Sequence, residues 1–272
     1  MKIKFTKMQG LGNDFIVVDL RGQDLKNIAG VVKRLADRRF GVGFDQALIL
    51  RKSKKADFRM DIYNNDGNRV EMCGNGIRCL ANYIWKRGLS RKPRLEIETL
   101  AGIIRPEKAG ALVRVDMGEP ILEGRLIPTV AEGALVDRPL AISDKSFLIT
   151  CVSMGNPHCV IFVDDVDGFP VGKYGPLIET NKFFPRRANV EFIEVLSPGR
   201  LKMRVWERGA GETLACGTGA SAAAVAAALK GLARRKVSVL LRGGVLKIEW
   251  AMDNHVYMTG PAQEVFTGVA EV

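Results

Sequence analysis

The sequence predicts an α+β protein built from two pseudo-symmetric domains, each a curved, mostly antiparallel β-sheet or barrel wrapped around a central α-helix. Three observations lead to this fold class. The pattern Cys-Gly-x-Gly occurs twice, at 73–76 and at 216–219. Each copy opens an apolar run with helical spacing that ends in Gly-Leu, and short β-rich runs dominate the rest of the chain.

A single offset relates the two halves of the chain. From Cys73 to Cys216 is 216 − 73 = 143 positions. The same offset carries Asn13 onto Asn156, Gln46 onto Asn189 and Asn64 onto Glu207. Core packing explains a repeated apolar pattern, but polar residues that recur in register with cysteines indicate that both halves present similar groups to one ligand. We therefore expect the site in a cleft between the halves.

The length of 272 residues suits two domains, each large enough to bury its own core. We place an N-terminal half-domain at 1–118 and a C-terminal half-domain at 119–261, because Gly-Pro-containing segments end both halves. Residues 262–272 lie outside the repeat and are expected to pack back on the first domain.

The elements follow from local patterns. Strands are expected at 3–8, 15–19, 58–63, 95–99, 112–117, 147–152, 159–163, 190–195, 201–206, 237–241 and 256–258. Apolar residues at helical spacing predict helices over 25–36 and 77–85. The matching run at 220–229 is nearly all alanine, and a helix that is apolar all round must be buried. The segment 122–145 is expected to be poor in strands.

Composition excludes several classes of protein. The formal net charge is +11, but the basic residues are scattered and no aromatic residues interleave with them, so we expect a solvated basic surface and no nucleic-acid partner. No apolar run approaches the roughly 20 residues that a membrane span needs. We expect a cytoplasmic protein with no membrane partner.

The five cysteines form no Cys-x-x-Cys pair, which argues against a disulfide framework. With only two histidines and no finger or ribbon spacing, no metal site is expected. Cys79, Cys151 and Cys159 lie on apolar faces and are interpreted as core residues.

Cys73 and Cys216 each precede a glycine and then a helix. A helix N-terminus presents unpaired N–H groups and partial positive charge, so it stabilises an anion and lowers the pKa of a thiol below its usual ~8.5. Two such ends facing one another would hold a carboxylate between two thiols. One thiol could then remove the α-proton while the other returns a proton to the opposite face. A lone cysteine at a helix start is more often a small hydrophobic residue, but the duplication in register favours chemistry.

Longer motifs carry a family resemblance. The segments 64–67, 72–78 and 207–219, together with 9–15 and 154–158, resemble those of diaminopimelate epimerase, and they span nearly the whole chain. The resemblance implies an epimerase that uses no cofactor and interconverts LL- and meso-diaminopimelate in the formation of lysine and peptidoglycan precursors. It also implies that the small-molecule substrate binds between two half-domains. We expect a homodimer.

The resemblance extends to individual positions. Cys73 and Cys216 resemble the two acid/base thiols, and His158 and Glu207 match groups that support them. The matching substrate contacts are Asn13, Gln46, Asn64, Gly74, Asn75, Asn156, Asn189, Glu207, Arg208, Gly217 and Thr218. Their chemistry suits a diamino diacid, because Arg208 can bind a carboxylate bidentately and Glu207 can accept from an ammonium group.

Two other readings remain open at this stage. A proline or hydroxyproline racemase or epimerase of the same fold would also use opposed cysteines, although a cyclic imino acid offers no distal charges for Asn75 and Arg208. The other reading is a basic binding protein without catalytic activity, built on a duplicated fold.

Overall fold

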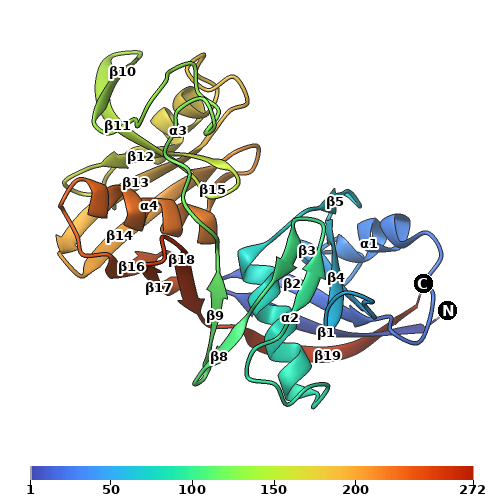
Figure 1. Cartoon of the computed structure of the whole chain (residues 1–272). Helices are drawn as coiled ribbons and strands as arrows, with labels where there is room; N and C mark the ends of the chain where they lie inside the picture. Colours follow the sequence, from blue (N-terminus) through green and yellow to red (C-terminus); the bar gives the residue numbers. More distant parts are fainter. Residues whose placement is uncertain (1, 272) are drawn as a thin grey trace. The chain divides into compact units, whose positions relative to one another are not determined.

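The computed structural model describes residues 2–271 and divides into two compact units. The first comprises the chain up to residue 115 together with the segment from residue 259 onward, and the second comprises residues 116–258. The chain leaves the first unit within β9 (Leu112–Asp116) and returns within β18 (Val256–Gly260) (Figure 1). Each unit is described separately.

The first unit contains a mixed sheet and two helices. The strands of this sheet are β1 (Lys2–Gly10), β2 (Asn13–Asp19), β3 (Gln46–Arg51), β4 (Phe58–Asn64), β5 (Arg69–Val70), β6 (Ile97–Thr99), β7 (Gly102–Ile104) and β19 (Gln263–Glu271), whereas β8 (Glu107–Ala109) pairs with β9. The helices are α1 (Ile28–Ala36) and α2 (Gly74–Lys86). The sheet order is β19-β1-β2-β3-β4-β6-β7, with β2–β3 and β4–β6 parallel.

The two helices of the first unit pack differently. α1 closes a buried apolar cluster that includes Ile3, Ile16, Val32, Leu35 and Phe44. α2 packs against β1, β2, β3 and β19, and almost all of its residues from Gly74 to Ile84 are buried. Because α2 is enclosed by strands, the position of its first turn is fixed by the core.

The second unit repeats this plan. Its strands are β10 (Arg138–Ile142), β11 (Lys145–Ser153), β12 (Pro157–Phe162), β13 (Asn189–Ser197), β14 (Arg200–Glu207), β15 (Gly211–Thr213), β16 (Lys236–Leu241) and β17 (Gly244–Trp250). The helices are α3 (Val171–Glu179) and α4 (Gly217–Leu229). The order runs β10-β11-β12-β13-β14-β16-β17-β18, with β12–β13 and β14–β16 parallel. α4 contacts β11, β12, β13, β14, β16 and β17.

The repeat found in the sequence holds in the structure. Both ends of α1 and α3 differ by 171 − 28 = 179 − 36 = 143, and α2 and α4 are related by the same offset. The parallel registers agree as well, since Phe15 pairs with Gln46 and His158 pairs with Asn189. The predicted fold class, a doubled α+β unit with sheet packed around a helix, is confirmed.

Three local expectations need correction. The segment 122–145 was expected to be poor in strands, yet β10 forms within it by pairing with β11. α3 was not expected, because Pro176 lies inside it and no side chain caps its start. The helix expected from residue 25 begins at Ile28, since the Asn27 side chain accepts from the Gly30 N–H and caps it there.

The C-terminal strand β19 belongs to the first unit. It runs antiparallel to β1 from Lys2 opposite Glu271 to Gln9 opposite Gln263, and the two strands lie side by side in Figure 1. β19 thus occupies the position beside β1 that β10 occupies beside β11. None of the helices among residues 2–271 has the length and apolar character needed to cross a membrane.

α3 is held by close packing on β14, which generates a stability prediction. A Cβ on Gly175 would lie 2.6 Å from Cγ of Trp206, whereas a Cβ on Gly172 of the same helix would meet nothing within 4 Å. We expect Gly175→Ala to lower the free energy of unfolding by about 1–3 kcal/mol through overpacking. The control Gly172→Ala should be neutral or slightly stabilising. Denaturant unfolding of both variants checks this, and an unchanged Gly175→Ala midpoint would contradict it.

Candidate active site

Each central helix begins with a cysteine as its N-cap. The Cys73 thiol accepts a hydrogen bond from the Gly76 N–H at 3.4 Å, and the Cys216 thiol accepts one from the Gly219 N–H at the same distance. Both cysteines have extended backbones, with φ of −142° and −121°. A thiol in this position receives an N–H dipole that favours its negative form.

In the first unit, Asn13 and Asn75 surround Cys73. The Cys73 thiol lies 3.8 Å from Oδ1 of Asn13 and can donate to it, and the same oxygen accepts from the Asn75 amide at 3.3 Å. The oxygen of Asn75 accepts in turn from the fully buried Arg78 at 2.9 Å. Arg78 also donates to the backbone oxygens of Gly74 and Pro261. These contacts fix the start of α2 and the side chains around it.

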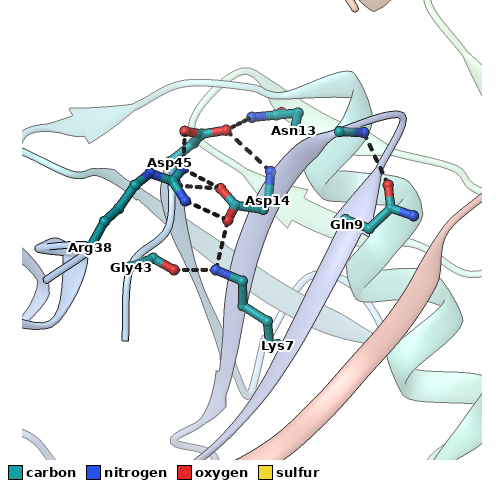
Figure 2. A network of polar contacts seen from close by, with 8 residues as sticks. Lys7, Gln9, Asn13, Asp14, Arg38, Gly43 and Asp45 are labelled. Atoms are coloured by element: carbon teal, nitrogen blue, oxygen red, sulfur yellow. Dashed lines mark hydrogen bonds and ion pairs between the residues drawn. The ribbon is translucent and has the colours of Figure 1, made fainter. Parts of the chain in front are cut away.

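The orientation of the Asn13 amide is set by Asp45. The Asn13 Nδ2 donates to Oδ2 of Asp45 at 2.8 Å, as Figure 2 shows. A carboxylate only accepts hydrogen bonds, so the amide nitrogen must face Asp45 and the amide oxygen must face Cys73. Arg38 bridges the arrangement by donating to Oδ1 of Asp45 at 2.9 Å and to Oδ1 of Asp14 at 2.8 Å.

Asp14 is the most strongly held carboxylate of this network. It accepts from Lys7, whose ammonium group also contacts the Gly43 carbonyl, and from both terminal nitrogens of Arg38 (Figure 2). Burial by itself would raise the pKa of Asp14, but the hydrogen bonds and charges of Arg38 and Lys7 lower it to about 2. The network ties the loop before β3 to the turn that carries Asn13.

Gln46 and Asn64 lie opposite each other on β3 and β4. The Gln46 amide donates to Oδ1 of Asn64 at 2.9 Å. Oε1 of Gln46 is buried and has no hydrogen-bond partner within residues 2–271. A buried amide oxygen without a partner is unfavourable, so this atom is available to a ligand donor.

In the second unit, the Cys216 thiol is more enclosed. It is 6% exposed and lies 3.5 Å from the Thr218 hydroxyl. Burial, followed by the nearby Glu207 and Glu191 carboxyl groups, raises the pKa of Cys216 well above its ordinary value. The expectation that the helix N-terminus lowers this pKa is therefore wrong for Cys216, because desolvation of the thiolate outweighs the N–H contacts.

Glu207 ends β14 beside this thiol. Burial raises the pKa of Glu207, while hydrogen bonds from Thr213 and Cys216 act against that rise. The carboxyl group of Glu207 is thus in contact with Cys216 and shares its desolvated surroundings.

Asn156 occupies in the second unit the place that Asn13 has in the first, since 156 − 143 = 13, and His158 follows two residues later. The Asn156 amide nitrogen donates to the Thr218 hydroxyl at 3.3 Å, and its oxygen lies 2.9 Å from Nε2 of His158. Nδ1 of His158 lies 2.7 Å from Oε1 of Glu191, and both side chains are fully buried. Both ring nitrogens of His158 therefore face oxygen atoms, Nδ1 a carboxyl oxygen and Nε2 an amide oxygen.

The Asn189 side chain contacts the backbone N–H of Arg208. The Asn189 side chain donates to the Pro157 carbonyl at 3.0 Å and accepts from the Arg208 N–H at 2.9 Å. The Arg208 guanidinium is exposed and donates to the Arg186 carbonyl at 3.3 Å. Asn189 therefore uses its amide to hold the β13–β14 edge, and Arg208 presents its charge to solvent.

The structure groups the predicted residues by unit. The residues of the first unit gather around Cys73 or on neighbouring strand ends: Asn13, Gln46, Asn64, Gly74 and Asn75. Those of the second unit gather around Cys216 and the β13–β14 edge: Asn156, His158, Asn189, Glu207, Arg208, Gly217 and Thr218. Cys79, Cys151 and Cys159 are buried, as predicted for core residues.

Sequence reasoning missed Asp45 and Glu191. A signal for Glu191 was present, because it is a charged residue within the apolar run Val190-Glu191-Phe192-Ile193. For Asp45 no comparable signal exists, since an aspartate in a loop is ordinary. Across the described residues, no group of three or more His, Cys, Asp or Glu side chains is arranged to hold a metal ion.

Comparisons with known proteins identify the family of the chain. A family model described as diaminopimelate epimerase matches residues 5–123 and 150–265. A diaminopimelate epimerase of Moorella thermoacetica is 53% identical over 272 residues, which cover 97% of this chain and 98% of that protein. Another, from Carboxydothermus hydrogenoformans, is 53% identical over 270 residues and 98% of each chain.

The fold recurs in a solved phenazine biosynthesis protein of the PhzF family from Bacillus anthracis, with a TM-score of 0.74 and 18% identity over the full length of both chains. Fold and site together define a duplicated α+β protein with a cysteine at the start of the central helix of each unit. Within that class, the chain belongs to the diaminopimelate epimerase family.

The low pKa of Asp14 generates a prediction on acid stability. A carboxyl group with a depressed folded-state pKa contributes stability that is present above its unfolded pKa of 3.8 and is lost as pH falls toward 2. Allowing for solvent screening, the contribution is about 1 kcal/mol. We expect Asp14→Asn to be destabilised by this amount at pH 7 and to lose less stability than the parent between pH 4 and 2. Denaturant unfolding across this range checks it, and parallel pH profiles would contradict it.

Proposed function

We propose that the protein interconverts LL- and meso-diaminopimelate, with Cys73 and Cys216 as the two acid/base groups. The proposal rests on a sequence identity of 53% to diaminopimelate epimerases over nearly the whole chain, combined with a cysteine cap on each central helix. The chain is then an isomerase that serves lysine biosynthesis.

The first turns of α2 and α4 supply the anion clamp of this proposal. Residues at a helix start have N–H groups without intrahelical acceptors. We propose that the amides of Gly74 and Asn75, and those of Gly217 and Thr218, bind the carboxylate at the reacting end. Charge balanced by N–H donors stabilises the enolate-like charge that develops when the α-proton leaves.

Inversion at carbon needs one thiolate and one thiol at the outset. The raised pKa of Cys216 supports Cys216 as the protonated thiol, with Cys73 as the base, for one of the two stereoisomers. The proton then leaves Cα for Cys73 Sγ as Cys216 Sγ–H delivers its proton to the opposite face. The reverse direction uses the same groups with exchanged roles. Because the thiols supply both acid and base, the proposal uses no cofactor.

The remaining contacts are assigned to substrate recognition. Carbonyl and amide groups of the set Asn13, Gln46, Asn64, Asn156 and Asn189 are proposed to bind the amino and carboxylate groups of the diamino diacid. The free oxygen of Gln46 supports this assignment. Glu207 is proposed to accept from an ammonium group and Arg208 to bind the distal carboxylate. We also propose that the protein is a cytoplasmic homodimer and that it binds no nucleic acid.

Single removal of either thiol tests the function. We expect Cys73→Ala and Cys216→Ala to fold and to lose epimerase activity by a factor on the order of 10⁴ or more, because inversion needs a group on each face. Proton NMR that resolves LL- from meso-diaminopimelate follows inversion, and exchange at Cα in D₂O is recorded beside it. The control Cys79→Ala changes a thiol outside the site and should remain active if folded. Exchange by the parent with proline but not diaminopimelate would instead favour an imino-acid racemase.

The exposed guanidinium of Arg208 generates a binding prediction. Arg208→Met should weaken diaminopimelate binding roughly thirtyfold, about 2 kcal/mol, because a charge-assisted contact is lost. Arg234 is a matched control, since it is an exposed arginine of the same unit and is not among the predicted site residues. Calorimetry measures both, and equal affinities for Arg208→Met and the parent would remove Arg208 from the site.

A further inference from the structure

The two units differ sharply at one pair of buried positions. Subtracting the offset, 158 − 143 = 15 and 191 − 143 = 48, so His158 and Glu191 occupy the places of Phe15 and Leu48. All four side chains are fully buried. The registers match as well, because Val17 pairs with Leu48 where Val160 pairs with Glu191. An apolar pair in one unit is a hydrogen-bonded ionisable pair in the other.

The fold itself does not require the ionisable pair. Burying two ionisable groups carries a desolvation penalty, and apolar replacements of similar volume are often neutral or stabilising. Phe15 and Leu48 demonstrate such a solution at the same positions of the same architecture. The presence of His158 and Glu191 on one side therefore points to the thiol beside them.

A continuous chain of contacts leads from Glu191 to Cys216. Oε1 of Glu191 lies 2.7 Å from Nδ1 of His158, Nε2 of His158 lies 2.9 Å from the oxygen of Asn156, and the Asn156 nitrogen donates to Thr218. The Thr218 hydroxyl lies 3.5 Å from the Cys216 sulfur. Because Thr218 accepts from Asn156, its own proton is free to point at that sulfur.

The corresponding amide of the first unit is turned the other way. Asn13 directs its oxygen toward Cys73 and Asn75 and its nitrogen toward Asp45. Asn156 directs its nitrogen toward Thr218, which occupies the place of Asn75, since 218 − 143 = 75. The two thiols therefore face different groups, an amide oxygen at Cys73 and a hydroxyl at Cys216.

We propose that Glu191 is a positioning residue for the reaction, which orients His158 and, through Asn156 and Thr218, directs a hydroxyl donor at Cys216. The inference rests on the proposed function for its kinetic part only. Glu191 also lies against the first turn of α4, since a Cβ on Gly219 would be 2.6 Å from its Oε1. Its second oxygen, Oε2, is buried without a hydrogen-bond partner among the described residues.

Several ionisable groups surround Cys216. Glu207 faces it from β14 and Glu191 from β13, while His158 lies between Glu191 and Asn156 on β12. After burial, the two carboxylates are the main causes of the raised pKa of Cys216, and Thr218 acts in the opposite direction. The Glu191 charge is a larger cause of this pKa than the Thr218 hydrogen bond. Removing the charge should therefore ease ionisation of Cys216 even when the Thr218 hydroxyl turns away, and it should leave Cys73 unchanged.

The test uses alkylation by iodoacetamide and epimerase kinetics on the whole protein. We expect Glu191→Gln to shift the pH dependence of Cys216 alkylation to lower pH and to lower kcat on the order of a hundredfold with KM little changed. The Cys73 profile, read from the same peptide maps, is the internal reference. Glu194→Gln on the same strand is the matched control and should behave like the parent.

The double variant His158→Phe with Glu191→Leu copies the apolar pair of the first unit. This variant should unfold as cooperatively as the parent. Its kcat should nevertheless fall on the order of a hundredfold, as expected for Glu191→Gln. Parent-like kcat and parent-like Cys216 alkylation in this variant would overturn the proposal, because the pair would then serve packing alone. If this variant does not fold, Glu191→Gln decides by the same two readouts. Alkylation needs no substrate, so a parent inactive on diaminopimelate would refute the proposed function and leave the Cys216 readout to judge Glu191.

Discussion

A thiol at the first turn of an enclosed helix is the constraint on which the site depends. Each central helix is held by strands on several sides, so its N-terminal N–H groups point to a fixed place. The cysteine cap accepts from one of these groups, and other N–H groups of the first turn have no acceptor within the helix. The close packing of the first turn of α4 on Glu191 requires a glycine at position 219, because a Cβ there would collide with the Glu191 side chain.

Burial and helix position oppose each other at Cys216. The N–H contact and the Thr218 hydroxyl favour the thiolate, whereas loss of water and two neighbouring carboxyl groups favour the thiol, and the second set dominates. A two-thiol inversion needs this kind of imbalance, since one group must hold a proton when the other does not. The duplicated fold supplies two equivalent caps, and the surrounding side chains make them chemically different.

The polar residues that surround Cys73 and Cys216 also differ between the two units. Around Cys73, Asp45 holds the Asn13 amide, and Arg38 and Asp14 hold Asp45 in turn. Around Cys216, His158 and Glu191 take that task from inside the core. One anchor is at the surface and exposed to screening by solvent, while the other is fully buried.

The sequence by itself determined the duplication, the central helices and the two caps, because Cys-Gly-x-Gly and the 143-residue offset are local, countable patterns. It also indicated buried Cys79, Cys151 and Cys159 through apolar surroundings. It did not predict α3, which contains Pro176 and exists through packing of Gly175 on Trp206, or β10, which exists by pairing with β11. The roles of Asp45 and Glu191 and the raised pKa of Cys216 were decided by tertiary structure, because desolvation and hydrogen-bond direction depend on neighbours far apart in the chain.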